Sequence, residues 1–305
     1  VPIYWIAFNL VLSESLKAAR KIVDSFPSIE DVFKAKSDDF ITIGVDKEKA
    51  EALTSPRLLD KASREMERLK KKGYSVLTIE DRDYPEYLRE IFDPPFVLYC
   101  AGEVEALKTL AVSIVGARKP SAYGKAVAEK LADELSSRGV VIVSGLARGI
   151  DSAAHWGALK GGKTVAVLGS GLERIYPREN RSLFQKIAAN GAVVSEFPLD
   201  SAPLGYHFPI RNRIISGLAL ALVVIEAAEK SGSLISARLA LEQNREVMAV
   251  PGNITSELSR GTNWLIKAGA KLVESWEDVA EELPSPWREK LLSQKKEEEP
   301  PRLSA

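Results

Sequence analysis

The feature that most constrains the fold of this chain is a series of short apolar runs that end in glycine or in small or polar residues. The runs are VVIVSG (140–145), TVAVLGSG (164–171), AVVSEF (192–197), ALALVVIEA (219–227) and VMAVPG (247–252). Near-continuous Val, Ile and Leu are typical of strands that are covered on both faces. Stretches of helical length separate the runs, so the sequence predicts an α/β fold with a mainly parallel sheet, right-handed crossovers and helices on both faces.

An earlier segment, SIVGARKPSAYGKAVAEKL, has the same organisation. A buried strand breaks at Gly116, and a helix begins near Ser121. The start of a helix offers free N–H donors and partial positive charge, and Arg118 and Lys119 add full charges. The turn lacks both the G-x-G-x-x-G spacing and the first glycine of a Walker loop. It therefore indicates either a simple phosphate site or a plain strand–helix connection.

Because ligands collect at the carboxyl ends of strands in such sheets, the residues after each strand define the candidate site. After the run at 140–145, Gly145 and Gly149 allow close backbone approach and Arg148 projects from the turn. Asp151 either caps the next helix or contacts a ligand. His155, farther along that helix, is interpreted as a packing residue, with a functional role as the alternative.

Two further strand ends carry glycine and serine. Gly169 and Gly171 allow another close approach, and Tyr176 beyond them is interpreted as structural. Gly232 and Ser233 open a later helix, where backbone N–H groups would be available. Each of these ends is weak evidence alone, but together they predict a polar pocket along one edge of the sheet.

The segment GYHFPIRNRIISGL places basic side chains beside aromatic ones. Arg211 and Arg213 flank Asn212 at an expected helix start, and Phe208 precedes them. Guanidinium groups bind phosphates and aromatic rings stack on unpaired bases, so the pattern favours a single-stranded nucleic acid. The alternative is a solvated first turn of a helix.

With 305 residues, the chain has room for one large domain and one smaller one. Residues 1–72 show helical periodicity without strand-like runs and predict a small all-α domain. Its segment FITIGVDKEKAEAL is weakly similar to a helix-hairpin-helix, in which the turn at Gly44 would contact a nucleic-acid backbone; a packing or partner-binding module is the alternative. Residues 73–283 hold the strands, and residues 284–305, rich in proline and charge, predict a disordered tail.

Charge and cysteine content narrow the functional classes. Residues 111–275 hold 20 Lys and Arg against 14 Asp and Glu, and the rest of the chain holds 22 against 28, which suits a core that binds polyanions. The single cysteine, Cys100, excludes an intrachain disulfide and favours a reducing compartment, so we expect a cytoplasmic protein. The apolar start IYWIAFNLVL lacks a basic n-region and is too short to span a bilayer, so we expect no membrane partner.

Taken in order, these segments resemble the DprA/Smf family of DNA-processing proteins. The motifs that carry the resemblance are GARKPSAYG, SGLARGIDSAAH, LGSGLERIYPREN, SEFPLDSAPLGYHFPIRNRIISGL, EAAEKSGSLISARLA, AVPGN and GTNWLIKAGA, and they span about residues 80–280. The resemblance implies an extended Rossmann-like domain that binds single-stranded DNA, forms a homodimer and loads RecA recombinase during natural transformation. The N-terminal helices resemble the accessory domain, of SAM or helix-hairpin-helix type, that many members carry. Many members end in a winged-helix domain, which we do not expect in residues 284–305.

The resemblance also assigns site residues. The matches to the DNA-contacting motifs are Arg118 in GARKPS and Arg211 and Arg213 in FPIRNR. The matches to the glycine-rich pocket are Gly116, Ser121, Gly145, Gly149, Gly169 and Gly171. Together with the strand-end analysis, this gives a set of expected DNA contacts: Arg118, Lys119, Ser121, Arg148, Phe208, Arg211, Asn212 and Arg213.

The sequence leaves two alternatives to DNA binding. A related nucleotide phosphoribohydrolase of the lysine-decarboxylase-like type would carry P-G-G-x-G-T-x-x-E, but the comparable turn here is KSGSLISAR, with Ala237 near the catalytic Glu position. A partner-binding scaffold would not explain the basic strand ends. No Ser–His–Asp set or metal-ligand spacing is visible, so we expect binding without turnover, without a cofactor and without a metal.

Overall fold

The sheet organises the molecule, as the apolar runs predict. The computed structural model describes residues 2–298 and contains a nine-stranded sheet of order β1-β2-β6-β5-β4-β3-β7-β8-β9. The strands are β1 (Ser75–Thr78), β2 (Val97–Gly102), β3 (Ala111–Val115), β4 (Val141–Ser144), β5 (Thr164–Val167), β6 (Ala192–Ser195), β7 (Ala221–Val224), β8 (Glu246–Ala249) and β9 (Lys271–Leu272). The pairs β1–β2 and β2–β6 are antiparallel and the other neighbours are parallel. The predicted mainly parallel α/β fold is confirmed.

Helices cover both faces of the sheet, because alternate strand residues are apolar on each side. On β4, Val141 and Val143 pack toward one face and Ile142 toward the other. The first face is covered by α7 (Glu86–Arg89), α11 (His207–Gly217), α12 (Gly232–Glu242) and α13 (Arg260–Lys267). The second is covered by α8 (Ala122–Ser137), α9 (Ile150–Gly161), α10 (Arg181–Asn190) and α14 (Trp276–Glu281). Short 3₁₀ turns are η1 (Val104–Leu107), η2 (Arg178–Asn180) and η3 (Glu257–Ser259).

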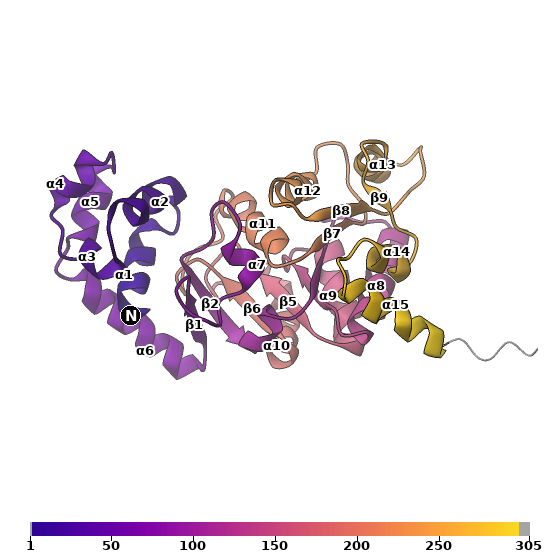
Figure 1. Ribbon diagram of the computed structural model, residues 1–305, viewed down its shortest axis with the longest axis horizontal. Helices are drawn as coiled ribbons and strands as arrows, with labels where there is room; N and C mark the ends of the chain where they lie inside the picture. Colours follow the sequence, from indigo (N-terminus) through magenta and orange to yellow (C-terminus); the bar gives the residue numbers. More distant parts are fainter. Residues whose placement is uncertain (1, 299–305) are drawn as a thin grey trace, which may run out of the picture.

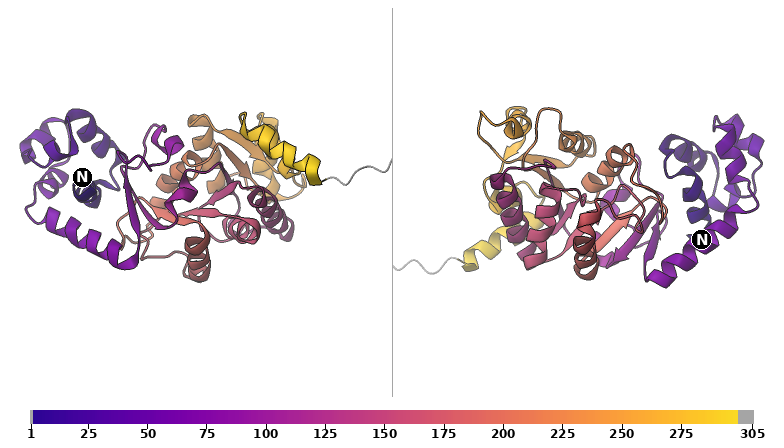
Figure 2. Two further views of the ribbon diagram at one scale, coloured as in Figure 1. Left: turned by 60° about the horizontal axis from the view of Figure 1, so that its bottom comes forward. Right: turned by 180° about the vertical axis from the view of Figure 1, so that it is seen from behind.

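The N-terminal residues form helices only, grouped at one end of the molecule (Figures 1 and 2). They are α1 (Pro2–Leu12), α2 (Leu16–Ser25), α3 (Ile29–Val32), α4 (Ser37–Thr42), α5 (Lys47–Leu53) and α6 (Leu58–Lys72). Trp5 and Phe8 of α1 pack on Phe96, which directly precedes β2, and the Trp5 and Phe96 rings stack with centroids 5.5 Å apart. This end of the sheet and the helices therefore share one hydrophobic core, and the domain division at residue 73 stays a prediction.

The expectation of a disordered tail was wrong for much of it. Helix α15 spans Trp287–Glu298 and lies at the opposite end of the molecule from the N-terminal helices (Figure 1). Trp287 and Leu291 are four residues apart and therefore share one helix face. Leu291 is buried in the core beneath α8, α9 and α14, which anchors the helix despite its high charge. Residues 299–305 lie outside the described residues.

None of the helices found between residues 2 and 298 combines the length and the apolar character needed to cross a membrane.

Candidate nucleic-acid interface

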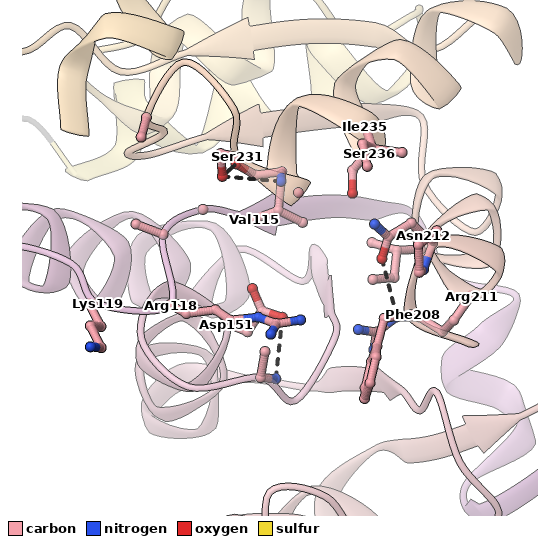
Figure 3. A pocket seen from close by; sticks show the side chains of 18 of the residues that line it. Val115, Arg118, Lys119, Asp151, Phe208, Arg211, Asn212, Ser231, Ile235 and Ser236 are labelled. Atoms are coloured by element: carbon pink, nitrogen blue, oxygen red, sulfur yellow. Dashed lines mark hydrogen bonds between the residues drawn. The ribbon is translucent and has the colours of Figure 1, made fainter. Parts of the chain in front are cut away.

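A cavity of about 800 Å³ lies where several parallel strands end. The end of β3 and its following turn form one part of the lining, from Val115 to Lys119. Other parts come from the start of α11, with Phe208, Arg211 and Asn212, and from the start of α12, with Ser231, Gly232 and Ser233. Figure 3 shows Ser231, Ile235 and Ser236 across the cavity from Arg118, Asp151 and Phe208. The predicted strand-end residues are therefore largely brought together.

Arg118 is an exposed cation in the lining of this cavity. Its guanidinium carbon lies 5.5 Å from the centroid of the Phe208 ring. The turn that carries it is fastened from below, because the Ile150 N–H donates to the Ala117 carbonyl at 3.1 Å. This contact needs Gly149, whose φ is +79° and where a Cβ would lie 2.3 Å from the Ala117 oxygen. Within residues 2–298 no ion pair to Arg118 or Lys119 is formed, so both charges are available to a ligand.

Arg211 has a different environment from Arg118. It is 4% exposed, and its guanidinium donates to the carbonyls of Gly145, at 2.5 Å, and Val167. A Cβ at position 145 would lie 2.7 Å from the guanidinium, which explains the glycine there. Burial lowers the pKa of Arg211 to about 10, with Arg118 adding to the shift and Asp151 opposing it. Arg211 thus joins the ends of β4 and β5 and forms the floor of the cavity.

One interpretation of the sequence made Asp151 the cap of α9, and the structure does not support it. The N-cap position is Gly149, and the Asp151 carboxylate accepts the N–H groups of Gly145 and Ala147 at 3.2 and 3.3 Å. Burial raises the pKa of the Asp151 carboxyl, whereas the charge of Arg211 and these two hydrogen bonds lower it. The residue lines the cavity and shapes the turn after β4.

The expected DNA contact at Arg213 is not supported by the structure. Arg213 and Arg211 are two residues apart within α11, and side chains at that spacing point to different sides of a helix. The Arg213 guanidinium donates to both oxygens of Glu196, at 2.8 and 2.6 Å, and lies 3.4 Å from an Asp93 oxygen. Both Arg213 and Glu196 are buried, and neither lines the cavity. The pair instead fixes α11 to the end of β6.

The helix start at Ser121 is also occupied by a protein group. The Ser121 N–H and hydroxyl donate to the two oxygens of Glu226, at 2.8 and 2.5 Å. The Ser121 hydroxyl in turn accepts the Gly124 N–H and caps α8. A carboxylate therefore takes the place that a phosphate was expected to fill, and Ser121 lies outside the cavity lining. The signal for Glu226, and likewise for Glu196, was an acidic residue at the end of an apolar run, because such a residue needs a buried partner.

A smaller cavity of about 50 Å³ shares several lining residues with the large one. Arg148, Gly145 and Gly169 lie here, and Arg148 forms an ion pair with Glu179. A Cβ at Gly169 would lie 2.8 Å from the Phe208 ring, so this glycine makes room for the aromatic side chain. Tyr176, interpreted from the sequence as structural, lines both cavities and its ring centroid lies 5.6 Å from that of Phe208.

The remaining predicted glycines divide into two groups. Gly116 and Gly232 line the large cavity, and a Cβ at Gly232 would meet nothing within 4 Å. Gly171 lies outside it, where its backbone approaches the carbonyls of Pro198 and Leu199. At the start of α12, the Ser231 hydroxyl accepts the Ser233 N–H, so serine caps this helix at the cavity wall.

This arrangement suits binding of an anion that carries apolar, flat groups. Exposed Arg118 and Lys119 provide charge, and the neighbouring Phe208 and Tyr176 rings provide surfaces for stacking. In the described part of the chain no group of three or more His, Cys, Asp or Glu side chains is placed to hold a metal ion.

Comparison with known proteins agrees with the sequence motifs. Residues 75–284 match the DNA recombination-mediator protein A family. DNA processing protein DprA of Bacillus subtilis is 43% identical over 247 residues, which are 80% of this chain and 83% of that protein. The X-ray structure of DprA from Streptococcus pneumoniae is similar with a TM-score of 0.75 and 37% identity, covering 92% of this chain and 97% of that one.

A second similar structure is DNA processing protein A from Helicobacter pylori, which was described for its single-stranded DNA binding mode. It has a TM-score of 0.63 and 35% identity, and the match covers 72% of this chain and 96% of that one. The sequence match exceeds half of the chain and the fold similarity includes nearly all of it. This chain therefore belongs to the DNA recombination-mediator protein A family, the DprA/Smf family that its motifs resemble.

Proposed function

We propose that this protein binds single-stranded DNA along the carboxyl edge of its sheet and releases it chemically unchanged. The observation that carries the proposal is the position of Arg118, an exposed guanidinium beside the Phe208 ring in a cavity of about 800 Å³. A phosphate on Arg118 and a base on Phe208 or Tyr176 would satisfy both kinds of surface at once. Family membership and the single-stranded DNA described for the Helicobacter pylori relative support it.

Single strands should be preferred over duplex DNA. Bases in a duplex are stacked on one another and cannot offer their faces to Phe208, whereas bases in a single strand can. Affinity should also fall as salt rises, because cationic contacts to phosphates release bound counterions. Lys119 adds to this effect, while the buried Arg211 contributes mainly to the shape of the cavity.

The role that we propose for this binding is to protect incoming DNA and to load RecA recombinase onto it during natural transformation or DNA processing. The family description, recombination mediator, supports a recombinase as the partner. We also propose a homodimer, in which two cavities engage one strand and raise the overall affinity. Leu272 on the edge strand β9 and Trp264 on α13 expose apolar side chains, and a second copy could pack there.

The proposed cellular location is the cytoplasm, where RecA acts on DNA. Burial raises the pKa of the single cysteine, Cys100, to about 12, so this thiol is poorly suited to redox chemistry.

No observation favours the alternative of a nucleotide hydrolase. Ala237, at the position where its catalytic Glu would be expected, lies on α12, is 1% exposed and packs into the core. The carboxylates of Asp151 and Glu226 are engaged by backbone N–H groups and by the Ser121 hydroxyl.

The experiment that tests the proposal is a titration of labelled oligo-dT and of a duplex of equal length, followed by fluorescence anisotropy at several salt concentrations. We expect tight, salt-dependent binding of oligo-dT and much weaker binding of the duplex. A nucleoside-monophosphate hydrolysis assay on the same preparation should give no product. Absent oligo-dT binding at low salt, or release of free base, would overturn the proposal.

A further inference from the structure

The segment between β6 and α11, residues 196–206, forms part of the cavity wall but has little regular structure of its own. Pro203 and Gly205 line the cavity, and Phe208 follows directly at the start of α11. A Cβ at Gly205 would meet nothing within 4 Å, so the backbone is loosely surrounded there. Hydrogen bonds from the loop after β5 and from the N-terminal helices hold the segment in place.

Contacts from the N-terminal helices hold this segment at its beginning and in its middle. The Asn9 side-chain amide of α1 donates to the Glu196 carbonyl at 2.8 Å. The Glu65 carboxylate of α6 accepts the Leu199 N–H at 2.7 Å. Both Asn9 and Glu65 are buried, so these contacts belong to the shared core.

The end of the segment is held by one acidic residue, Glu14, in the turn between α1 and α2. One Glu14 oxygen accepts the Tyr206 hydroxyl at 2.7 Å, and the other lies 3.0 Å from His207 Nε2. Because a carboxylate only accepts, Nε2 of His207 carries the hydrogen of that contact. The His207 ring also stacks on Phe197, with centroids 4.0 Å apart, so its orientation is fixed on two sides.

We propose that Glu14 is a positioning residue for the DNA site. It fixes Tyr206 and His207, and these residues stand between Gly205 and Phe208, which line the cavity. The N-terminal helices thus hold one wall of the pocket in its binding shape, although none of the described residues 2–72 lines that cavity. This inference rests on the proposed function, and it assigns a role to the N-terminal helices.

The charge of Glu14 makes the inference sharply testable. Removing a negative charge near a site for a polyanion should, by electrostatics alone, strengthen binding. Removing a residue that holds the pocket wall should weaken binding, because the loosened segment must be ordered when DNA binds. The two explanations therefore predict changes of opposite sign.

The experiment measures oligo-dT affinity, its salt dependence and thermal unfolding for the full chain and three variants. Glu14→Ala removes both hydrogen bonds, and we expect the dissociation constant to rise about fivefold to tenfold. Tyr206→Phe keeps the ring and removes one hydroxyl, and we expect a rise of about twofold to threefold. Glu67→Ala, an exposed acid on α6, is the charge-matched control and should bind as the unchanged protein does or slightly more tightly.

Further readouts separate positioning from a general structural effect. The slope of affinity against salt should stay the same in Glu14→Ala, because the phosphate contacts are unchanged in number. The double variant Glu14→Ala/Tyr206→Phe should bind no more weakly than Glu14→Ala, since both act through one contact. The unfolding temperature of Tyr206→Phe should be unchanged, which keeps the test valid even if Glu14→Ala loses stability.

The outcomes distinguish this inference from the proposed function. Weaker binding in both variants with an unchanged salt slope supports the positioning role. Binding equal to or tighter than that of the unchanged protein in folded Glu14→Ala and Tyr206→Phe overturns it and leaves the proposed function standing. Failure of the unchanged protein to bind oligo-dT overturns the proposed function, and this inference with it.

Discussion

Two regions near the cavity use arginine in opposite ways. At the turn after β3, Arg118 is exposed, lies beside the Phe208 ring and has no ion-pair partner within the described residues. On α11, Arg211 and Arg213 are both buried, and their guanidinium groups bond to backbone carbonyls and to Glu196. The turn after β3, with Arg118 and Lys119, forms the rim of the cavity and presents charge to a ligand. Helix α11 instead uses its charged side chains to hold the protein together.

The difference teaches that a basic motif identifies a site without saying which of its residues contact the ligand. A buried guanidinium has lost its water and needs protein acceptors, which then leave few donors for a phosphate. An exposed guanidinium keeps its N–H donors free for a ligand, but its side chain is held less firmly in one position. Substitutions in the two regions should therefore affect different properties, and the following predictions test that division.

The largest expected effect is on stability, from Arg213→Ala. Removing this guanidinium leaves the Glu196 carboxylate buried without its bidentate partner, and loss of one member of a buried pair costs about 3–5 kcal/mol. Urea denaturation should show this loss in the free energy of unfolding. The paired replacement Arg213→Met/Glu196→Leu should recover much of it. A stable Arg213→Ala that binds oligo-dT poorly would instead make Arg213 a DNA contact and break the comparison.

A second prediction concerns buried polar groups and pH. Burial, with a contribution from Arg211, lowers the pKa of His155 from 6.5 to about 3. The unfolded chain then takes up a proton first as pH falls, so His155 contributes stability above pH 6.5 that is lost progressively between 6.5 and about 3. Between pH 7 and pH 5 this loss is about 2 kcal/mol.

Comparison with His155→Leu isolates that contribution. Urea denaturation at pH 7 and pH 5 should show a drop in unfolding free energy that is about 2 kcal/mol larger for the unchanged protein than for the variant. Equal drops in the two proteins would mean that the His155 ring takes up a proton as readily in the folded protein as in the unfolded chain. The Thr164 hydroxyl donates to the Ile142 carbonyl and so accepts from His155 Nδ1, which leaves Nε2 as the atom that protonates.

The rim should respond differently, and Arg118→Ala is the third prediction. We expect oligo-dT to bind about tenfold more weakly, because one charge-assisted contact to a phosphate is lost, with no change in unfolding free energy. Arg238→Ala, an exposed arginine on α12 outside the cavity lining, is the matched control and should bind normally. Equal losses in both variants would point to a general effect of net charge.

The smallest expected effect comes from Gly169→Ala. The added methyl group would lie 2.8 Å from Cδ1 of Phe208, so the ring must move a few tenths of an ångström or more. We expect a weakening of oligo-dT binding by about threefold, because the stacking surface is displaced. Gly232→Ala is the comparison, because a Cβ there meets nothing within 4 Å. Its oligo-dT affinity should not fall through a clash within the protein.

The sequence predicted the sheet well, and several of the residues that it singled out line the large cavity, because both follow from local pattern. Apolar runs with glycine ends located the parallel strands, and the known behaviour of such sheets placed Arg118, Phe208 and Asn212 at one edge. The partners of the polar residues were not predicted. Glu226 binds Ser121 across 105 residues, and no local pattern indicates which distant group will fill a helix start.

Residue spacing in the sequence accounts for two of the differences between expectation and structure. Arg211 and Arg213 cannot both face one ligand from one helix, because residues two apart point to different sides. Trp287 and Leu291 have the four-residue spacing of a helix face within a stretch whose charge and proline content suggested disorder. Tyr176 gave no such signal, because its place beside Phe208 depends on how two loops meet.

The most direct test of this account is the slope of oligo-dT affinity against salt for the unchanged protein and for Arg118→Ala. If exposed Arg118 holds a phosphate, the variant should bind more weakly and its slope, on logarithmic axes, should be smaller by about one. If the two proteins show the same slope and the same affinity, the exposed arginine contacts no phosphate, and the division between a binding rim and a structural helix is contradicted.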